Sequence, residues 1–364
     1  MSYDVAVIGT GAEPDDPGGD GYAMAYHHAN AYEKLDAADL VACADIVPEN
    51  AEAFAAEYGI DDGGIYEDYE TMLNEVEPEV VSVCVPPSIH APICIDCARA
   101  ASVEGIHCEK PMAETYGGAR QMTQEAARHD VQLTFNHQRR FSDAVRTAKQ
   151  LLDDGEIGDL ERVEFSAGVG IFDYGSHSFD LCNYFNDEVP GEWVMGQIDY
   201  REENVLFGSH NENQALVMWQ YENGVHGLAG TDSTGQGGPA EAIACHNRLV
   251  GSEGVIEVGP DGDDAPPLRI RRDGDDEWEY VETEDGMHDW AFVDRAIAEN
   301  IRCLSEDEKP ELRAENALNA TELIFATWES SRRRGRVDLP LDVEDNPLVE
   351  MVESGELNPR QTEE

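Results

Sequence analysis

The first third of the chain alternates short apolar runs with amphipathic, helix-like segments. Apolar runs at residues 3–8, 40–45, 80–85 and 106–108 are each followed by a turn signal. Buried parallel strands form continuous apolar runs, and the crossovers between them are usually helices. The pattern therefore predicts an α/β fold with a doubly wound parallel sheet. Helices are expected from about residue 21 and at 48–59, 69–76, 91–101 and 113–129, with a further strand at 132–135.

Strand patterns dominate after residue 160. Short loops and alternating polarity predict a large open sheet that is antiparallel or mixed, within an α+β domain. The expected strands lie at 160–168, 193–200, 214–221, 225–231, 243–250, 253–258, 268–272 and 278–282. Helices at 173–186, 288–304 and 313–334 are expected to cover one face of this sheet. The other face is then a candidate surface for a homo-oligomer, a dimer or a tetramer.

A junction near residues 136–141 separates the two patterns. A chain of 364 residues with 41% hydrophobic residues is long enough for two domains. We expect a dinucleotide-binding Rossmann domain at residues 1–139 and an α+β domain for catalysis, substrate binding and oligomerisation at 140–340. The acidic residues 341–364 are expected to form an extension of low order.

The chain is strongly acidic along its whole length, with 24 Lys and Arg against 77 Asp and Glu and a net charge of −53. Such a field repels phosphate backbones and anionic lipids, so nucleic-acid and membrane partners are not expected. It also predicts a fold that requires salt and a halophile-type proteome, because about 1 M salt limits the repulsion between carboxylates to a range of about 3 Å.

Targeting signals and cysteine usage favour the cytoplasm. No signal peptide opens the chain, and no run of about 18 apolar residues occurs in it. The eight cysteines are scattered, which favours buried, reduced thiols over a disulfide framework. Cys94 and Cys97 form a C-x-x-C inside a helical pattern, without a second pair or a His at metal spacing, so core packing is favoured and no metal site is expected.

Polar or turn residues follow four of the predicted parallel strands, where α/β sheets bind ligands. They are Gly9, Thr10 and Gly11 after the first strand, Asp45 after the second, Pro86 after the third and Lys110 after the fourth. A carboxylate at the position of Asp45 accepts hydrogen bonds from both hydroxyls of an adenosine ribose and repels a 2′-phosphate. Asp45 therefore favours NAD over NADP, although in so acidic a chain it also fits an ordinary turn.

The glycine turn departs from a normal dinucleotide fingerprint, in which the third small residue comes three positions after the second Gly. Residues 12–20 intervene here, and Ala25 takes the third small position. The insertion places the carboxylates of Glu13, Asp15, Asp16 and Asp20 where a pyrophosphate is expected. It either forms an outward-pointing flap or alters how the cofactor binds. The glycine pair by itself is equally typical of a plain tight turn.

Asp173, His177 and Asp180 have the spacing i, i+4 and i+7, so a helix would place them on one face. A histidine fixed by a neighbouring carboxylate suits a base that takes a hydroxyl proton. Lys110 is a candidate cation for the alkoxide that develops in such a reaction. A helix N-terminus capped by Asp173, with His177 as a buried and satisfied residue, fits this segment equally well.

In combination these motifs resemble the Gfo/Idh/MocA family of glucose–fructose oxidoreductase, inositol dehydrogenase and related enzymes, over nearly the whole chain. The motifs are Gly9-Thr10-Gly11 with Ala25, His28, Ala29 and Ala31; Asp45; residues 86–90; Glu109-Lys110-Pro111; Asn136 with Arg139-Arg140-Phe141; residues 155–158; Asp173, Gly175, His177 and Asp180; and residues 251–254, Ala326, Ser330 and Pro340.

The resemblance implies an N-terminal Rossmann domain, a C-terminal α+β domain with a large open sheet, and NAD(P)-linked oxidation or reduction of sugars, polyols or related alcohols. It implies Lys110 and His177 as the catalytic pair, Asp173 as the residue that orients His177, Glu109 and His90 on the nicotinamide side, Asp180 on the substrate side, and a cis Lys110–Pro111 bond. Lys110 would then contact cofactor and substrate.

We therefore expect an NAD-dependent dehydrogenase that moves hydride between nicotinamide and a sugar, polyol or related hydroxy compound. Two alternatives stay open. One is a keto-sugar or carbonyl reductase of the same family, and the other is a nicotinamide-binding regulator without turnover, which the unusual glycine loop favours. The short segment from Ala167 to Asp173 lacks room for a loop that often lines the sugar pocket, so the resemblance does not identify the substrate.

Overall fold

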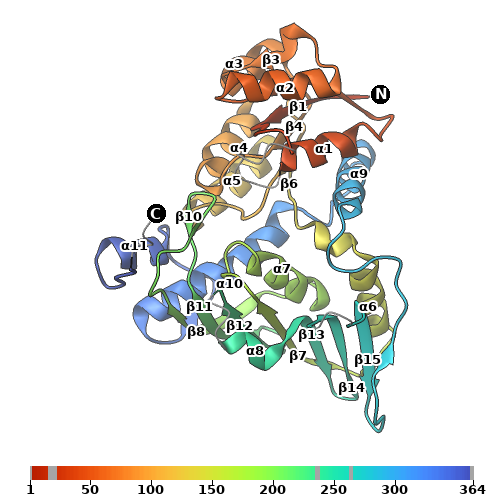
Figure 1. Cartoon of the computed structure of the whole chain (residues 1–364), viewed down its shortest axis with the longest axis vertical. Coiled ribbons are helices and arrows are strands. Elements are labelled where there is room, and N and C mark those ends of the chain that lie inside the picture. Colours follow the sequence, from red (N-terminus) through yellow and green to blue (C-terminus); the bar gives the residue numbers. More distant parts are fainter. Residues whose placement is uncertain (1, 15–22, 234–237, 262–264, 361–364) are drawn as a thin grey trace. The chain divides into compact units, whose positions relative to one another are not determined.

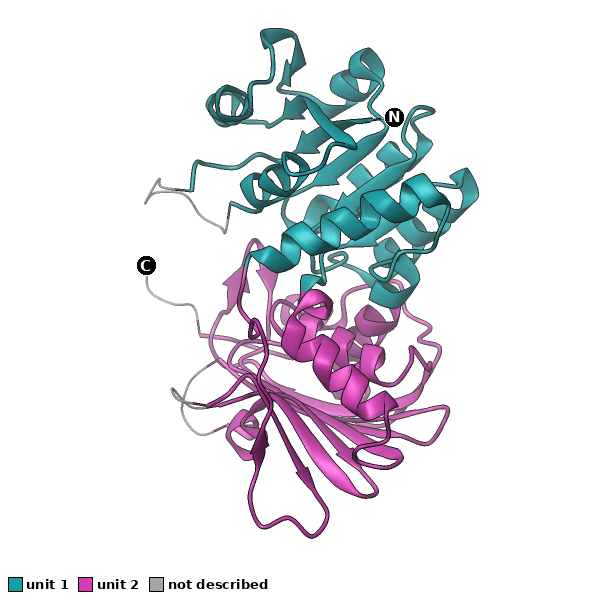
Figure 2. Cartoon of the chain, turned by 90° about the vertical axis from the view of Figure 1, so that its right-hand side faces the viewer, with its two compact units in different colours: residues 1–138, 290–318 teal, residues 139–289, 319–364 magenta. Residues whose placement is uncertain are grey.

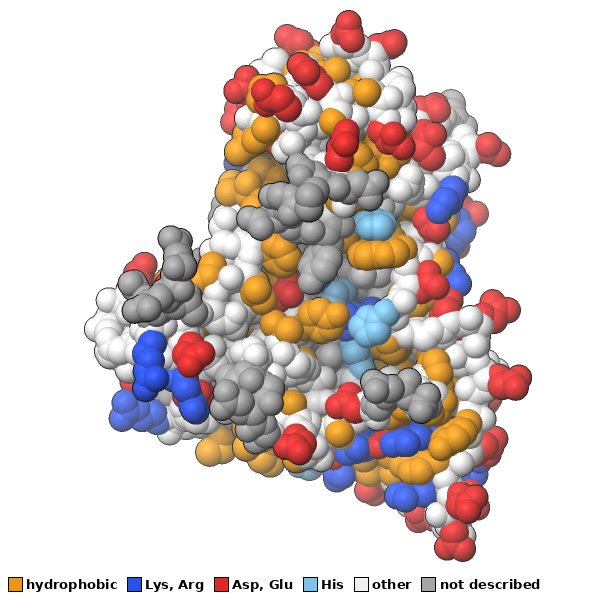
Figure 3. Space-filling model, in the orientation of Figure 1, with side chains coloured by type: hydrophobic (Ala, Val, Ile, Leu, Met, Phe, Trp, Pro, Cys, Tyr) orange, Lys and Arg blue, Asp and Glu red, His pale blue; other side chains and the backbone are white. Residues whose placement is uncertain are grey.

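The chain forms two compact units, coloured separately in Figure 2. The computed structural model describes residues 2–14, 23–233, 238–261 and 265–360. Unit 1 comprises the chain up to Gln138 together with Trp290–Leu318, and unit 2 comprises Arg139–Asp289 with the chain from Asn319 onwards. The boundary after Gln138 lies one residue from the expected boundary after residue 139. Residues Trp290–Leu318, in contrast, were expected in the second domain. Acidic side chains are spread over the visible face of each unit (Figure 3).

Unit 1 is built on a six-stranded parallel sheet with the order β3-β2-β1-β4-β5-β6. The strands are β1 (Tyr3–Ile8), β2 (Ala38–Ala44), β3 (Ile65–Tyr66), β4 (Val80–Val83), β5 (Gly105–Cys108) and β6 (Gln132–Phe135). Strand β1 pairs in parallel with both β2 and β4, so the strand order reverses beside it. Ligands of doubly wound folds bind at the carboxyl ends of the strands at such a reversal. The predicted fold class of this part is confirmed.

Helices of unit 1 connect these strands (Figure 1). They are α1 (Met24–Tyr32), α2 (Pro48–Tyr58), α3 (Tyr69–Val76), α4 (His90–Arg99) and α5 (Tyr116–His129), with short 3₁₀ turns η1 (Asp62–Gly64) and η2 (Pro87–Ile89). Helix α9 (Ala291–Glu306) belongs to the same unit but comes much later in the chain. Local sequence sets two of their starts. Asp68 accepts from two amides of the first turn of α3, and the Thr115 hydroxyl accepts from the Gly118 amide at the start of α5. Cys94 and Cys97 of α4 lie in the hydrophobic core.

Helix α9 packs in unit 1, which corrects the expectation that this helix covers the second sheet. Its apolar residues Val293, Ile297 and Ile301 recur at helical spacing and form a cluster with Val5 of β1 and Tyr32 of α1. Lys34 and Asp294 add an exposed ion pair with an N–O distance of 2.7 Å. The helical period identifies the apolar face of a helix, but it does not identify the core against which that face packs.

Unit 2 is built on a nine-stranded sheet with the order β16-β15-β14-β13-β7-β12-β11-β8-β17. Its strands are β7 (Leu160–Ala167), β8 (Gly191–Asp199), β11 (Gln214–Tyr221), β12 (His226–Asp232), β13 (Cys245–Gly251), β14 (Gly254–Pro260), β15 (Leu268–Arg272), β16 (Glu279–Tyr280) and β17 (Val337–Asp338). Strands β7 and β12 are parallel, and the other described pairings are antiparallel. Strands β9 (Val205–Leu206) and β10 (Ser209–His210) form a separate pair.

Long helices cover one face of this sheet, as expected, and the short helix α8 (Pro239–Ile243) packs against Gly230 of β12 on the other face, where a Cβ atom on Gly230 would lie 2.6 Å from Pro239. Helices α6 (Asp143–Asp153), α7 (Gly175–Phe185) and α10 (Ala314–Arg333) lie on the same side (Figures 1 and 2). Phe165 of β7 and Trp219 of β11 point to that side and pack against Phe179 of α7. Side chains alternate along a strand, so Leu216 and Met218 point to the opposite face, where both are half exposed.

The C-terminal segment up to Arg360 is folded, which corrects the expected extension of low order. Leu341, Leu348 and Met351 are buried. Helix α11 (Pro347–Glu353) is capped by Asn346, whose side chain accepts from two amides of the first turn. These apolar positions are few and separated by acidic residues, so the sequence pattern does not predict a folded segment. In the structure, their burial is enough to fix the segment on unit 2.

Gly227 allows the closest packing of the second sheet. A Cβ atom there would lie 1.8 Å from Cε2 of Trp219, a ring that is fully buried. Gly227→Ala is therefore expected to lower the free energy of unfolding by about 1–3 kcal/mol or more, because Trp219 is held against Phe179 and cannot move aside. Denaturant unfolding measures the change. Gly335→Ala is the control, since its Cβ meets no atom of the described residues within 4 Å; equal losses in the two variants would contradict the packing argument.

Candidate active site

The carboxyl ends of β2, β1, β4 and β5 are neighbours in the sheet of unit 1, and the predicted strand-end residues follow them. We call this border the strand-end edge. Gly9 begins it with φ +84°, and a Cβ atom there would lie 2.5 Å from Val85 and 3.0 Å from the carbonyl oxygen of Cys84. Only glycine fits this position, which brings the backbone after β1 close to the end of β4.

Asp45 stands at the end of β2 and joins two loops of the strand-end edge. Its Oδ2 accepts from the Thr10 hydroxyl at 3.1 Å and from the Gly11 amide at 2.9 Å. Its Oδ1 accepts from the Val47 amide at 2.9 Å. The carboxylate is partly exposed, so it is accessible at the strand end, as the sequence pattern predicted. The same bonds also hold the glycine turn in place.

The start of α1 follows the glycine turn. Its first turn carries no acidic residue, and no side chain among the described residues caps it. Residues 15–22 lie outside the described residues, and most of the insertion at 12–20 lies within that gap. Ala25 is buried against Val7 and Phe54, so its small side chain serves close packing of α1 on the sheet. Pro86 is exposed at the end of β4 and starts the η2 turn.

Glu109 is a buried carboxylate directly before Lys110. Its Oε1 accepts from Asn136 Nδ2 at 2.7 Å and lies 3.0 Å from His28 Nε2. The Lys110 amide donates to Oε2 at 3.2 Å. Burial alone would raise the pKa of Glu109, but the bonds from His28 and Asn136 and the charge of Lys110 outweigh it and hold the pKa at about 2. Glu109 is therefore ionised and fixed.

The polar chain continues from Glu109 into the core of unit 1. Ionised Glu109 can only accept, so His28 donates to it from Nε2, while His28 Nδ1 lies 2.8 Å from the Ser82 hydroxyl. His107 Nδ1 lies 2.9 Å from the Thr134 hydroxyl, and burial lowers its pKa to about 3. Sequence reasoning gave these residues no role. The available signal was polar residues within otherwise apolar strands, at Ser82, His107 and Thr134.

His90 lies beneath the strand-end edge and contacts the backbone that follows β4 and β5. It is fully buried, with Nε2 at 2.7 Å from the Val85 carbonyl oxygen and Nδ1 at 2.9 Å from that of Pro111. Burial lowers its pKa. It was expected to line the nicotinamide side, but its ring nitrogens bridge the ends of β4 and β5. The Lys110–Pro111 bond is cis, as the resemblance implied, and the Lys110 side chain is half-buried.

In unit 2, Asp173 and His177 lie at the start of α7. The helix begins at Gly175, so Asp173 belongs to the turn before it rather than to the helix expected from residue 173. The Ser176 hydroxyl donates to the Asp173 carbonyl oxygen at 2.8 Å, which closes this turn onto the helix. Asp173 and His177 are both 4% exposed. A buried acid and a buried histidine therefore stand four residues apart where α7 begins.

A polar segment before β11 fixes that turn, and sequence reasoning missed it. Asn211 Oδ1 accepts from the Asp173 amide at 3.1 Å. Glu212 is fully buried and accepts from the Ile171 amide at 2.6 Å and from the Trp328 indole at 3.0 Å. Burial raises the pKa of Glu212. The signal was the run Asn-Glu-Asn directly before an alternating strand, which by itself looks like an ordinary polar loop.

Asp180 is engaged by Arg140. Arg140 Nε and Nη2 each lie 2.7 Å from one of the Asp180 carboxylate oxygens, and Nη1 lies 2.6 Å from Glu188. Asp180 was expected on the substrate side, together with His177. The structure shows its carboxylate in a buried, bidentate ion pair that ties α7 to the η3 turn (Gln138–Phe141).

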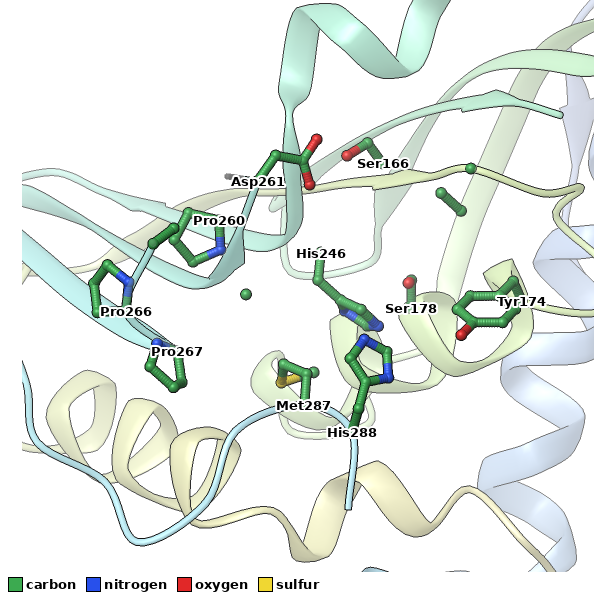
Figure 4. A pocket seen from close by; sticks show the side chains of 14 residues that line it. Ser166, Tyr174, Ser178, His246, Pro260, Asp261, Pro266, Pro267, Met287 and His288 are labelled. Carbon is green, nitrogen blue, oxygen red and sulfur yellow. The ribbon is translucent and has the colours of Figure 1, made fainter. Parts of the chain in front are cut away.

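A pocket of about 420 Å³ opens beside α7 within unit 2 (Figure 4). Tyr174, directly before α7, and Ser178 of α7 line it. His246 of β13 and His288 point toward one another in it. The volume lies in the range of about 300–1,000 Å³ that small-molecule sites occupy. The pocket therefore offers space for a small molecule beside α7, although His177 is not among the residues that line it.

Comparison with known proteins identifies the family. The sequence model of the Gfo/Idh/MocA oxidoreductase family with an NAD-binding Rossmann fold matches residues 4–137, and that of the family's C-terminal α/β domain matches residues 161–339. The chain belongs to the Gfo/Idh/MocA family. Unit 1 thus contains an NAD-binding Rossmann domain, and the strand-end edge is where that fold holds its dinucleotide.

Several relatives in the family carry assigned activities. D-apiose dehydrogenase of Paraburkholderia graminis is 23% identical over 352 residues, 90% of each chain. Inositol 2-dehydrogenase of Rhizobium meliloti is 29% identical over 268 residues, 66% of this chain and 77% of that protein. The fold is similar to an inositol dehydrogenase homologue of Azotobacter vinelandii solved with NADH and myo-inositol, with a TM-score of 0.74, 18% identity and coverage of 93% and 98%.

In the described part of the chain, no group of three or more His, Cys, Asp or Glu side chains has the arrangement of a metal site. No helix within the same residues is long and apolar enough to cross a membrane.

The Glu109 network predicts a pH-dependent stability. A folded-state pKa of about 2 against 4.5 stabilises the fold above pH 4.5, and this stabilisation is lost as the pH falls toward 2. Its size is on the order of 3 kcal/mol. Glu109→Gln is therefore expected to be less stable than the wild type at pH 7, with a difference that shrinks toward pH 3. Denaturant midpoints between pH 7 and 3 measure it.

The control for that measurement is Glu52→Gln, an exposed acid on α2. Its stability curve should run parallel to that of the wild type. A constant gap between Glu109→Gln and the wild type across this pH range would contradict the assignment of an ionised, bonded Glu109.

Proposed function

We propose that this protein is an NAD-dependent dehydrogenase that oxidises a secondary hydroxyl or hemiacetal carbon of a sugar, polyol or related hydroxy compound. The observation that carries the proposal is the presence of two candidate sets in one chain: Lys110 at the strand-end edge of an NAD-binding sheet, and Asp173 with His177 at the start of α7. The activities named for D-apiose dehydrogenase and inositol 2-dehydrogenase support the substrate class.

Residues of unit 1 fit the cofactor. Gly9 brings the backbone close to β4, and the start of α1 has no acidic side chain in its first turn to repel a pyrophosphate. Asp45 presents a carboxylate at the end of β2 for the ribose hydroxyls, which favours NAD over NADP. When bound, NAD accepts or donates a hydride at C4 of the nicotinamide. Ionised Glu109, fixed by His28 and Asn136, holds the backbone from which Lys110 extends.

Proton transfer is assigned to the residues of α7. Oxidation of an alcohol yields a carbonyl, a hydride for NAD⁺ and one proton, so a base must take the hydroxyl proton as the C–H bond breaks. His177 is the proposed base, and Asp173 is the proposed residue that orients it and stabilises the imidazolium. Lys110 is the proposed cation for the developing alkoxide. Asp180, held by Arg140, would then position α7 instead of contacting substrate.

The same groups also serve the reverse reaction, because a base that accepts the hydroxyl proton returns it to a carbonyl oxygen on reduction. Relative rates with NAD and alcohol against NADH and keto sugar decide between the directions. A regulator without turnover remains the alternative from another class. Lys110, Asp173 and His177 together argue against it, since a sensor needs no proton-transfer set.

We further propose a salt-adapted protein that works in a reducing compartment as a homo-oligomer. Its net charge of −53 and its eight free thiols support the first two points. The open face of the second sheet supports the third, because Met195, Leu216 and Met218 are 50–54% exposed there. Met195 and Met218 are paired across β8 and β11, so the three side chains form one patch, the open-face patch.

The catalytic assignment predicts the effect of two substitutions. Lys110→Ala and His177→Ala are each expected to lower kcat/KM for NAD-linked oxidation by about 10²-fold or more, because each removes a group that acts on the reacting hydroxyl. NADH formation with a panel of sugars and polyols in molar KCl measures the loss. Lys309→Ala and His226→Ala, which alter exposed residues, are the controls. Rates like those of the wild type in both test variants would remove the assignment.

The open-face patch predicts the oligomeric state. In sedimentation velocity at molar KCl the wild type should sediment as a dimer or tetramer, and Met218→Asp should shift it toward the monomer by placing a charge in the apolar contact. Ile46→Asp is the control, because Ile46 is 85% exposed on unit 1. A monomeric wild type would rule out this surface as the interface.

A further inference from the structure

Glu212 is a buried carboxylate of unit 2 to which the proposed chemistry gives no role. It lies two residues before β11, and no lysine, arginine or histidine among the described residues is ion-paired with it. Three neutral groups bind it instead: the Ile171 amide, the Trp328 indole and the Thr231 hydroxyl, which lies 3.3 Å from Oε1. A buried carboxylate without a counter-charge is costly, and proteins break such rules most often at functional sites.

The three donors to Glu212 come from different parts of unit 2. Ile171 lies in the turn at residues 171–174 before α7, Thr231 on β12 and Trp328 on α10. Each carboxylate oxygen faces an N–H donor, which suits the ionised form. Burial raises the pKa of Glu212, and the bonds from these donors oppose that rise. Glu212 therefore ties the turn before α7 to the sheet and to the long helix α10.

Asn211 binds the same turn two residues further along. Its side-chain oxygen accepts from the Asp173 amide at 3.1 Å, so two adjacent side chains bind alternate amides of the turn. We call Asn211 and Glu212 the turn anchor. Gly170 lies against both of them, because a Cβ atom there would lie 3.0 Å from Asn211 Cβ and 3.1 Å from Glu212 Oε1. The close approach of this glycine lets the backbone reach the turn anchor.

Packing holds the residue between the two bound amides. Phe172 is 2% exposed, and the centroid of its ring lies 5.5 Å from that of Trp328. Trp328 thus acts on the turn twice, through its bond to Glu212 and through its contact with Phe172. The backbone of Asp173 follows directly, so both hydrogen bonds and ring packing limit its movement.

We propose that Glu212 and Asn211, the turn anchor, are positioning residues of the reaction. By holding the turn they fix the backbone of Asp173, and with it the place of His177 in the first turn of α7. The inference rests on the proposed function, which assigns these two residues to proton transfer. Proton transfer depends on distance and orientation, so a shift of the turn by about 1 Å is expected to lower the rate by up to about 10²-fold. An apolar residue at position 212 would leave the Ile171 amide without its acceptor.

Three substitutions each disturb one bond of the turn anchor. Glu212→Gln keeps the size of the side chain but turns an amide N–H group toward one of its N–H donors. Asn211→Ala removes the acceptor of the Asp173 amide, and Trp328→Phe removes the indole N–H while it keeps an aromatic ring beside Phe172. Asn211→Ala and Trp328→Phe keep the test decisive if Glu212→Gln does not fold.

Steady-state kinetics in molar KCl measure the effect, with the sugar or polyol that the wild type oxidises fastest. Each variant is expected to lower kcat about tenfold or more, because the proposed base is displaced. The KM for NAD should stay within about twofold of the wild type, because the cofactor belongs to the NAD-binding domain of unit 1. An unchanged kcat in the variants that fold would overturn the positioning role.

Leu348→Ala is the control for a loss of stability alone. Leu348 is fully buried in α11 of the same unit, and Figure 1 shows α11 well apart from α7. The substitution should lower the denaturant midpoint and leave kcat of the folded enzyme within about twofold of the wild type. A loss of kcat as large as in the anchor variants would mean that the turn anchor acts through stability only, and would overturn the proposal.

Hydrogen exchange reports on the turn without any turnover. Peptides that span residues 170–175 should exchange about tenfold faster or more in Glu212→Gln and Asn211→Ala, relative to a peptide of β13, and should keep the wild-type rate in Leu348→Ala. Exchange that is unchanged in both anchor variants would show that the turn anchor does not fix the turn, and would overturn the proposal.

The outcomes separate this inference from the proposed function. An active wild type whose anchor variants keep their kcat would leave the dehydrogenase standing and remove the positioning role. A wild type that oxidises no sugar or polyol would overturn the dehydrogenase together with that role, and the exchange rates would still decide whether the turn anchor fixes the turn.

Discussion

The pairing of buried charges is the constraint on which the candidate site depends. A charge taken out of water is tolerated only with partners, and this chain has far more carboxylates than cations to distribute. Glu109 is held by His28 and Asn136, and Arg140 by Asp180 and Glu188. In unit 1 the Glu109 network contacts the backbone of Lys110, and in unit 2 the Arg140 network holds α7 through Asp180. The buried charged pairs therefore support the residues proposed to act on the substrate and are not themselves the reacting groups.

Most of the fold and one border of the site could be predicted from the sequence, because both depend on local patterns. The parallel strands of unit 1 appear as continuous apolar runs, and the connection rule places their ends along one edge. Gly9, Asp45 and Lys110 follow those ends in the sequence, so their grouping needed no knowledge of distant contacts. Alternating polarity in the second half of the chain likewise predicted a sheet with one covered face and one open face, and in β11 Trp219 and Met218 lie on opposite sides.

The parts that sequence reasoning missed depend on long-range partners. The apolar stripe of α9 is visible in the sequence, but its contacts with Val5 and Tyr32 are made almost three hundred residues away. Asp180 has the spacing of a site residue, yet Arg140 engages it from the η3 turn. The anchor at Asn211 and Glu212 looks like a solvated loop until Ile171 and Trp328 are seen to donate to it. Spacing identifies a face, and only the fold shows what that face meets.

An acidic protein that binds NAD, whose pyrophosphate is anionic, presents an electrostatic conflict, and the ionic strength resolves it. The acidic side chains spread over the surface repel an anion at long range (Figure 3). At about 1 M salt that repulsion reaches only about 3 Å, so the surface charge no longer opposes entry. Contacts at hydrogen-bond distance are screened far less, so the amides at the start of α1, whose first turn holds no acidic side chain, keep their attraction for a pyrophosphate. Binding of the cofactor then depends on these short contacts, and the net charge of the chain has little influence on it.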